Sequence, residues 1–216
     1  MLHPMLFDER VPKQYGSYKQ ARGFAILKSS LFLSCCQDIA KLTIDSSTNA
    51  PSLKRSVEGL MDSGMLAKCK ARYIEDRPIF DGDDKPEPDL VEVYWSIHAS
   101  EREARSKEFD SKYVQLLTAW EAFSNSPLSN SFRVVRDKVT AHTELKGDDY
   151  KPIDISTLGI KWGNLKTVIS EMQVIVELLN NLIRDAGFAW ESFDGMVEKA
   201  ALGFWSDRDL LNPVRQ

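Results

Sequence analysis

The feature that most constrains the fold is an unbroken helical periodicity in the last third of the chain. From about residue 163 to 186, apolar residues recur at spacings of three and four, which places them on one face of an α-helix. The members of this face are Leu165, Val168, Ile169, Met172, Ile175, Val176, Leu179, Leu182 and Ile183. A helix of this length buries such a face only against other elements, so the rest of the chain must supply them. Gly187, just past the pattern, is expected to cap the helix.

The N-terminal part predicts a second long helix, from Ser17 to about Leu42. Its apolar positions recur at spacings of three and four: Phe24, Leu27, Leu31, Cys35 and Ile39. Between residues 24 and 36 the sequence is apolar on nearly every side, which predicts a central, buried helix. A break follows, and Pro51 is well placed as the first residue of a helix over about 52–62, interrupted by Gly64.

A loop insertion is expected at about residues 75–95. The segment "EDRPIFDGDDKPEPD" holds three prolines, one glycine and seven acidic residues, a composition typical of a long surface loop. The segment "LVEVYWSI" that follows fits either a short strand or the start of the next helix. Helical patterns then cover about 99–123 and about 127–142.

These segments predict an all-α architecture. We expect an antiparallel helical bundle of about five main helices, with the loop insertion and a C-terminal helical extension. The helical domain would cover residues 1–187, and an aromatic helical extension would cover 188–216. The aromatic residues of the extension suggest that it docks onto the domain or onto a partner: Trp190, Phe193, Phe204 and Trp205.

Composition narrows the class of protein. A hydrophobic content of 43% supports a sizeable core, and a net charge of −4 argues against a protein that binds nucleic acid through its overall charge. No apolar run of 18 residues and no signal layout occurs, so we expect no membrane association and a cytoplasmic location. Of the three cysteines, Cys35 and Cys36 lie in an apolar helical run and are expected to be buried, reduced thiols.

Several motifs of enzyme chemistry do not occur in the sequence. It lacks the glycine-rich phosphate loops, the nucleophile elbow of hydrolases, and the histidine and cysteine spacings that hold zinc. His3, His98 and His142 lie far apart in the chain. We therefore expect no cofactor and no metal.

The remaining candidate is "SFRVVRDKVTAHTEL", residues 131–145, where charged residues flank an apolar helical seam that is expected to be buried: Phe132, Val135 and Val139. On one straight helix Arg136 and His142 would point roughly 120° apart, so direct contact would need the helix to end or a second protomer to contribute. Histidine suits proton transfer and arginine suits a phosphate, which together fit phosphodiester cleavage without a metal. Supporting or RNA-binding roles fall to Arg133, Asp137 and Lys138. The alternative is that Arg136 and Lys138 are solvated and that His142 caps the helix.

The segment "RDKVTAH" resembles the R-x(4–6)-H motif of the HEPN superfamily, and more narrowly the abortive-infection HEPN-like proteins of the Abi U type. The resemblance implies a metal-independent endoribonuclease acting as a toxin or anti-phage effector, with Arg136 and His142 forming the active site across a homodimer. It also implies RNA as substrate and an antitoxin protein as partner. HEPN toxins silenced by nucleotidylation carry a tyrosine two positions after the histidine, where this chain has Glu144. The alternative function is a non-catalytic helical module that binds a partner protein or a nucleotide.

Overall fold

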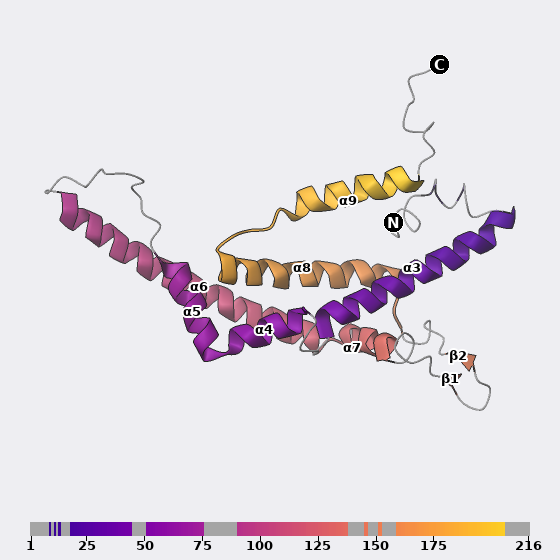
Figure 1. Ribbon diagram of the computed structural model, residues 1–216, viewed down its shortest axis with the longest axis horizontal. Helices are drawn as coiled ribbons and strands as arrows, with labels where there is room; N and C mark the ends of the chain where they lie inside the picture. Colours follow the sequence, from indigo (N-terminus) through magenta and orange to yellow (C-terminus); the bar gives the residue numbers. More distant parts are fainter. Residues whose placement is uncertain are drawn as a thin grey trace, which may run out of the picture. The chain divides into compact units, whose positions relative to one another are not determined.

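The computed structural model describes residues 9, 11, 13, 18–44, 51–75, 90–137, 145–146, 151–152 and 159–205. Over these residues the secondary structure consists of helices joined by short connections, together with two strands of two residues each (Figure 1). The helices are α3 (Tyr18–Ile44), α4 (Leu53–Met61), α5 (Ser63–Ile74), α6 (Val91–Ser124), α7 (Pro127–Val134), α8 (Trp162–Arg184) and α9 (Trp190–Trp205). The all-α prediction is confirmed, and five of these helices have twelve or more residues.

The two strands form a small antiparallel pair that the sequence did not predict. β1 (Leu145–Lys146) pairs with β2 (Lys151–Pro152), and Leu145 lies opposite Pro152. Two residues per strand are too few to define an alternating pattern, because periodicity is detected only over four or more residues.

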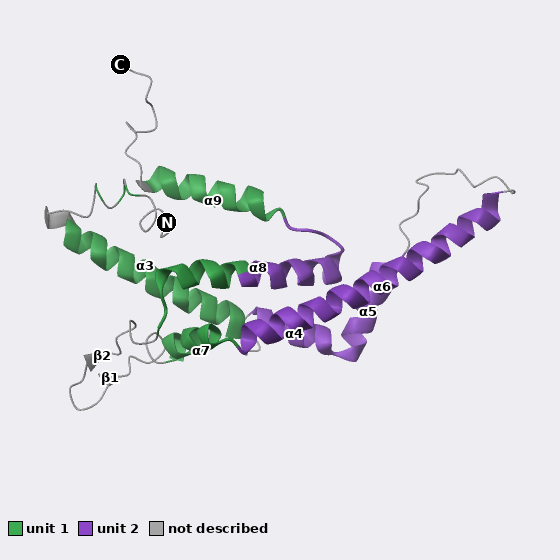
Figure 2. Cartoon of the chain, turned by 180° about the vertical axis from the view of Figure 1, so that it is seen from behind, with its two compact units in different colours: residues 1–44, 126–170, 189–216 green, residues 45–125, 171–188 purple. Residues whose placement is uncertain are grey.

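The chain divides into two compact units (Figure 2). Unit 1 comprises residues 1–44, 126–170 and 189–216, and unit 2 comprises residues 45–125 and 171–188. The helix α8 contributes its first turns to unit 1 and the remainder to unit 2. Within the described residues, no helix is both long enough and apolar enough to cross a membrane.

In unit 1, α3 packs against α7. The buried side chains of α3 follow one face: Phe32, Cys36, Ile39, Ala40 and Thr43. Phe32 also contacts the ring of Trp162 at the start of α8, with 4.2 Å between ring centroids. The prediction of a helix buried on nearly every side between residues 24 and 36 is wrong, since Ile26 is 58% exposed and Leu27 is 40% exposed. Apolar composition therefore overstated the burial of this helix.

In unit 2, α5 and α6 pack together as an antiparallel pair. Lys70 of α5 forms an ion pair with Asp110 of α6, whereas Tyr73, further along α5, contacts the earlier residue Phe109. The two rings meet edge to face with centroids 5.4 Å apart, and both are buried. Aromatic pairs in this arrangement stabilise a core beyond the effect of their buried area.

The junction between α4 and α5 lies at Asp62 instead of Gly64. Asp62 ends α4 in an extended conformation and also caps α5, because its Oδ1 accepts a hydrogen bond from the Met65 amide at 2.9 Å. A side-chain oxygen at this position satisfies an amide that has no partner within the helix. Ser52 caps α4 in the same way, so Pro51 precedes the helix and is not its first residue.

The structure resolves the alternative at "LVEVYWSI" in favour of a helix. These residues form the first turns of α6, which begins at Val91, eight residues before the expected start. Alternation of apolar residues is compatible with a strand, but the segment continues without a break into a long helical sequence, and helix formation extends cooperatively from an existing helix.

Candidate functional site

The helix α7 carries the first part of the predicted site and is anchored in unit 1. Ser126 caps it, since its hydroxyl oxygen accepts a hydrogen bond from the Ser129 amide at 3.0 Å, and Pro127 follows as the first helical residue. Phe132 and Val135 are fully buried on the face that packs in the unit. The predicted start of this helix and the burial of these two residues are confirmed. Val139, the third member of the expected seam, lies outside the described residues.

The regular α-helix ends at Val134, and residues 135–137 continue as a wider π turn. A π turn has more residues per turn than an α-helix, so each residue rotates by less than the α-helical angle. The roughly 120° separation expected between Arg136 and His142 assumed a straight α-helix. That assumption does not hold over residues 135–137.

Arg136 and Asp137 are joined in this turn. Arg136 Nε donates to Asp137 Oδ1 at 2.7 Å, and the Arg136 side chain is 26% exposed. The contact therefore joins two consecutive residues of the π turn. The contact uses one edge of the guanidinium and limits its rotation. Arg133, one helical turn earlier, is exposed to solvent.

The other predicted site residues, Lys138 and His142, lie outside the described residues. The structure thus brings Arg136 and Asp137 together within one protomer, while the relation of Arg136 to His142 stays a prediction. Among the residues that the structure does describe, no group of three or more histidine, cysteine or acidic side chains is arranged to hold a metal ion.

The thiols of α3 belong to the same unit as this site. Cys36 is completely buried and Cys35 is half-buried, and both are free thiols. Burial raises the pKa of Cys36 to about 12, and the charge of the neighbouring Cys35 acts in the same direction. A thiol with such a pKa is a poor nucleophile at neutral pH, because the thiolate is the reactive form. Cys36 therefore serves packing.

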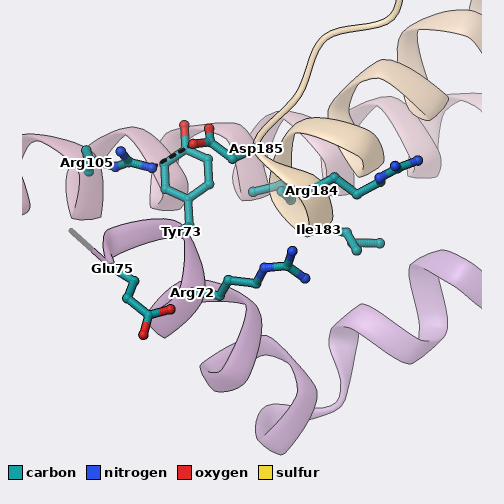
Figure 3. A pocket seen from close by; sticks show the side chains of 8 residues that line it. Arg72, Tyr73, Glu75, Arg105, Ile183, Arg184 and Asp185 are labelled. Atoms are coloured by element: carbon teal, nitrogen blue, oxygen red, sulfur yellow. Dashed lines mark hydrogen bonds and ion pairs between the residues drawn. The ribbon is translucent and has the colours of Figure 1, made fainter. Parts of the chain in front are cut away.

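A separate group of basic residues lines a pocket of about 240 Å³ in unit 2 (Figure 3). Its lining comes from the end of α5, the middle of α6 and the end of α8: Arg72, Tyr73, Glu75, Arg105, Leu182, Ile183, Arg184 and Asp185. Sequence patterns did not predict this pocket. Arg105 lies in "SEREARSKEFD", which reads as a solvated charged segment, and Arg184 lies in an apolar helical pattern.

Asp185 shapes one edge of this pocket. It follows the last residue of α8 and has a φ of 51°, a left-handed conformation that only glycine, asparagine and aspartate adopt readily. Asp185 Oδ2 accepts a hydrogen bond from Arg105 Nη2 at 2.7 Å. The expected cap at Gly187 is therefore wrong: Asp185 takes the left-handed position, two residues earlier.

Comparison with known proteins gives one match. A family model described as AbiU2, of the HEPN type (HEPN_AbiU2), matches residues 2–204. This range covers most of the chain, including α7, α8 and α9. No curated protein and no solved structure matches the chain.

Proposed function

The chain belongs to the AbiU2 family of HEPN proteins, and on that premise we propose that it is a metal-independent endoribonuclease acting as a toxin or anti-phage abortive-infection effector. The observation that carries this proposal is Arg136, which is half-buried at the end of α7 and fixed by Asp137. It stands six positions before the histidine of "RDKVTAH". A positioned arginine is the group that a phosphodiester transition state requires.

The proposed reaction needs only groups of this chain and its substrate. Neutral His142 takes the proton of a ribose 2′-hydroxyl, the 2′-oxygen attacks phosphorus, and the bond from phosphorus to the 5′-oxygen breaks. A protonated histidine then gives a proton to the leaving oxygen. Arg136 stabilises the negative charge that grows on the phosphoryl oxygens, and Arg133 and Lys138 hold flanking phosphates. The products carry a 2′,3′-cyclic phosphate and a 5′-hydroxyl.

The two proton transfers motivate a homodimeric site. One transfer needs a neutral imidazole and the other needs an imidazolium, and each protomer supplies a single His142. In a dimer with twofold symmetry the same surface of both protomers meets, so two copies of the motif reach one cleft. The two histidines then divide the roles of base and acid.

The direct test incubates the full chain with total RNA in the presence of a chelator. We expect His142→Ala and Arg136→Ala to lower the cleavage rate by on the order of 10²-fold or more. Lys166→Ala is the matched control, because Lys166 is an exposed cation of unit 1 outside the motif. Cleavage that is equal in all four proteins, or undetectable in the wild type, would exclude the proposed catalysis.

Mixing variants tests the shared site. Wild-type and His142→Ala protomers, mixed in equal amounts and allowed to exchange subunits, pair at random, so about one quarter of the dimers carry both histidines. If the shared cleft needs both histidines, activity should fall to about one quarter of that of the same amount of wild type. Activity of about one half, despite verified subunit exchange, would show that each protomer supplies a complete site.

A second candidate function is a module that binds a partner protein such as an antitoxin. It is favoured by the apolar side chains that α9 exposes at helical spacing: Phe193, Met196, Val197 and Phe204. Proteins that dock a helix use such spacing as anchors. If this face binds a partner, Met196→Asp should abolish capture of that partner, whereas Glu198→Gln on the same helix should not. Capture that survives Met196→Asp would count against this role for α9.

A further inference from the structure

The pocket of unit 2 gathers three arginines from three helices. Arg72 lies in the last turn of α5, Arg105 in α6 and Arg184 at the end of α8 (Figure 3). These residues are distant in sequence, and they are distinct from the "RDKVTAH" motif of unit 1. All three line the same pocket of about 240 Å³, which is a property of the packed unit.

The pocket carries positive charge in a chain that is negative overall. Its charged lining residues are three arginines and two acids, Glu75 and Asp185, so the sum is +3 − 2 = +1, whereas the whole chain carries −4. Asp185 is engaged with Arg105. Within the described part of the chain, the guanidinium groups of Arg72 and Arg184 make neither an ion pair nor a hydrogen bond with another side chain. Among the residues that the structure describes, two guanidinium groups therefore remain available to a ligand.

Arg105 adds a fixed donor. Its Nη2 is held by Asp185, and its guanidinium lies 5.1 Å from the centroid of the Tyr73 ring. Its Nε is buried and has no hydrogen-bond partner among the described residues. A buried N–H that lacks a partner is unfavourable, so a rotation of the side chain that brings this N–H to an acceptor atom of a ligand would be stabilising.

Size and charge define the ligand. The pocket is smaller than the roughly 300–1,000 Å³ typical of sites that enclose drug-sized molecules, so it suits a compact group. Arginine forks match the oxygen geometry of phosphate. A terminal phosphate carries about −1.5 to −2 charges, whereas each phosphodiester of a nucleic-acid backbone carries one. Several arginines around one small space therefore suit a terminal phosphate group better than a phosphodiester of a nucleic-acid backbone.

We propose that this pocket binds the diphosphate or terminal phosphate group of a small phosphorylated molecule. The group lies between Arg72 and Arg184, and Arg105 positions it from the α6 side. The remainder of the molecule extends into solvent, because the pocket has no room for it. This proposal does not depend on RNA cleavage, since it involves neither Arg136 nor His142.

The test measures binding of pyrophosphate to the full chain by calorimetry at constant ionic strength. We expect Arg72→Ala and Arg184→Ala each to weaken binding by about tenfold to a hundredfold, the usual effect of losing charged hydrogen bonds. Lys68→Ala is the matched control: it removes one exposed cation from the same helix as Arg72, one turn away, outside the pocket lining. It should bind as the wild type does. Arg72 and Arg184 are exposed, so thermal melting without ligand should be nearly unchanged in both variants.

Parallel titrations with orthophosphate and with ADP separate a free phosphate ion from a nucleotide as the source of the group. Binding of either that requires Arg72 and Arg184 supports the proposal. Equal pyrophosphate binding by all four proteins, or no binding of any phosphate compound, would overturn it. Binding of an RNA without terminal phosphates through Arg72 and Arg184, unaffected by pyrophosphate, would also overturn it and indicate a backbone contact.

Discussion

Asp185 allows two contributions to stability to be separated at one position. Its φ of 51° is unfavourable for most side chains, and its carboxylate bonds Arg105 at 2.7 Å. Alanine and glycine both remove the carboxylate, but only glycine adopts this φ without strain. The left-handed conformation costs a residue with a Cβ about 1–2 kcal/mol. Glycine is also more flexible than alanine in the unfolded chain, which lowers the stability of the glycine variant by about 0.4–1 kcal/mol.

We therefore expect Asp185→Gly to be more stable than Asp185→Ala by about 0.5–1 kcal/mol, although both are less stable than the wild type. Asp185→Asn tolerates the same φ and keeps an acceptor oxygen, so it isolates the effect of charge. The side chains of Arg105 and Asp185 are 30% and 32% exposed, a burial between a surface pair and a fully buried one. We expect Asp185→Asn to cost about 1 kcal/mol.

The assay is urea denaturation of the single variants and of a double-mutant cycle that combines Asp185→Asn with Arg105→Gln. We expect a coupling energy of about 1 kcal/mol that decreases when salt is raised to 1 M. Arg105→Gln alone should cost more than Asp185→Asn, because Arg105 also lies over the ring of Tyr73. Equal stability of the glycine and alanine variants would refute the strain argument, and a coupling of zero would refute the ion-pair argument.

Three further predictions concern the cores and a helix cap. Phe109→Ala should lower the free energy of unfolding by about 3–5 kcal/mol, since the ring is fully buried, whereas Val114→Ala on an exposed face of α6 should change little in the same urea titration. Burial raises the pKa of Cys36 from 9.0 to about 12, so between these pH values the folded state keeps a proton that the unfolded state loses. The free energy of unfolding should therefore fall as pH rises from about 9 to about 12. Cys36→Ala should show a shallower decline over that range, and identical pH curves would contradict this assignment. Asp62→Ala should cost about 1 kcal/mol through loss of the α5 cap, while Asp62→Asn should retain most of the stability; equal losses would show that the cap is unimportant.

The helices themselves were accessible from the sequence. The apolar rhythm of α8 predicted a helix over about 163–186, and the helix spans Trp162–Arg184. Proline after serine predicted the start of α7, and Ser126 caps it as the local rules require. These features depend on residues three or four positions apart, which is the distance over which helical periodicity and capping act.

The predictions of helix ends were wrong where two residue types, glycine and aspartate, could each end a helix. Gly64 and Gly187 fit helix ends by residue type, yet Asp62 and Asp185 take these roles. Asp62 caps α5 through a local bond from the Met65 amide, whereas the carboxylate of Asp185 accepts from Arg105, 80 positions away in the chain. Glycine was favoured because it lacks a Cβ, and that rule cannot anticipate a side chain stabilised by a tertiary contact. The same limit applies to α3, whose apolar residues are distributed all around the helix although only one face is covered.

The sequence by itself determined the helical class and most of the helices, and the resemblance to the HEPN type agrees with the AbiU2 family model that matches residues 2–204. Only the tertiary structure decided that Arg136 meets Asp137 in a π turn, and that Arg72, Arg105 and Arg184 share a pocket. Helical periodicity records which side of a helix is apolar, because that depends on neighbours along the chain. The convergence of charged side chains depends on how separate helices pack, and no local pattern encodes that packing.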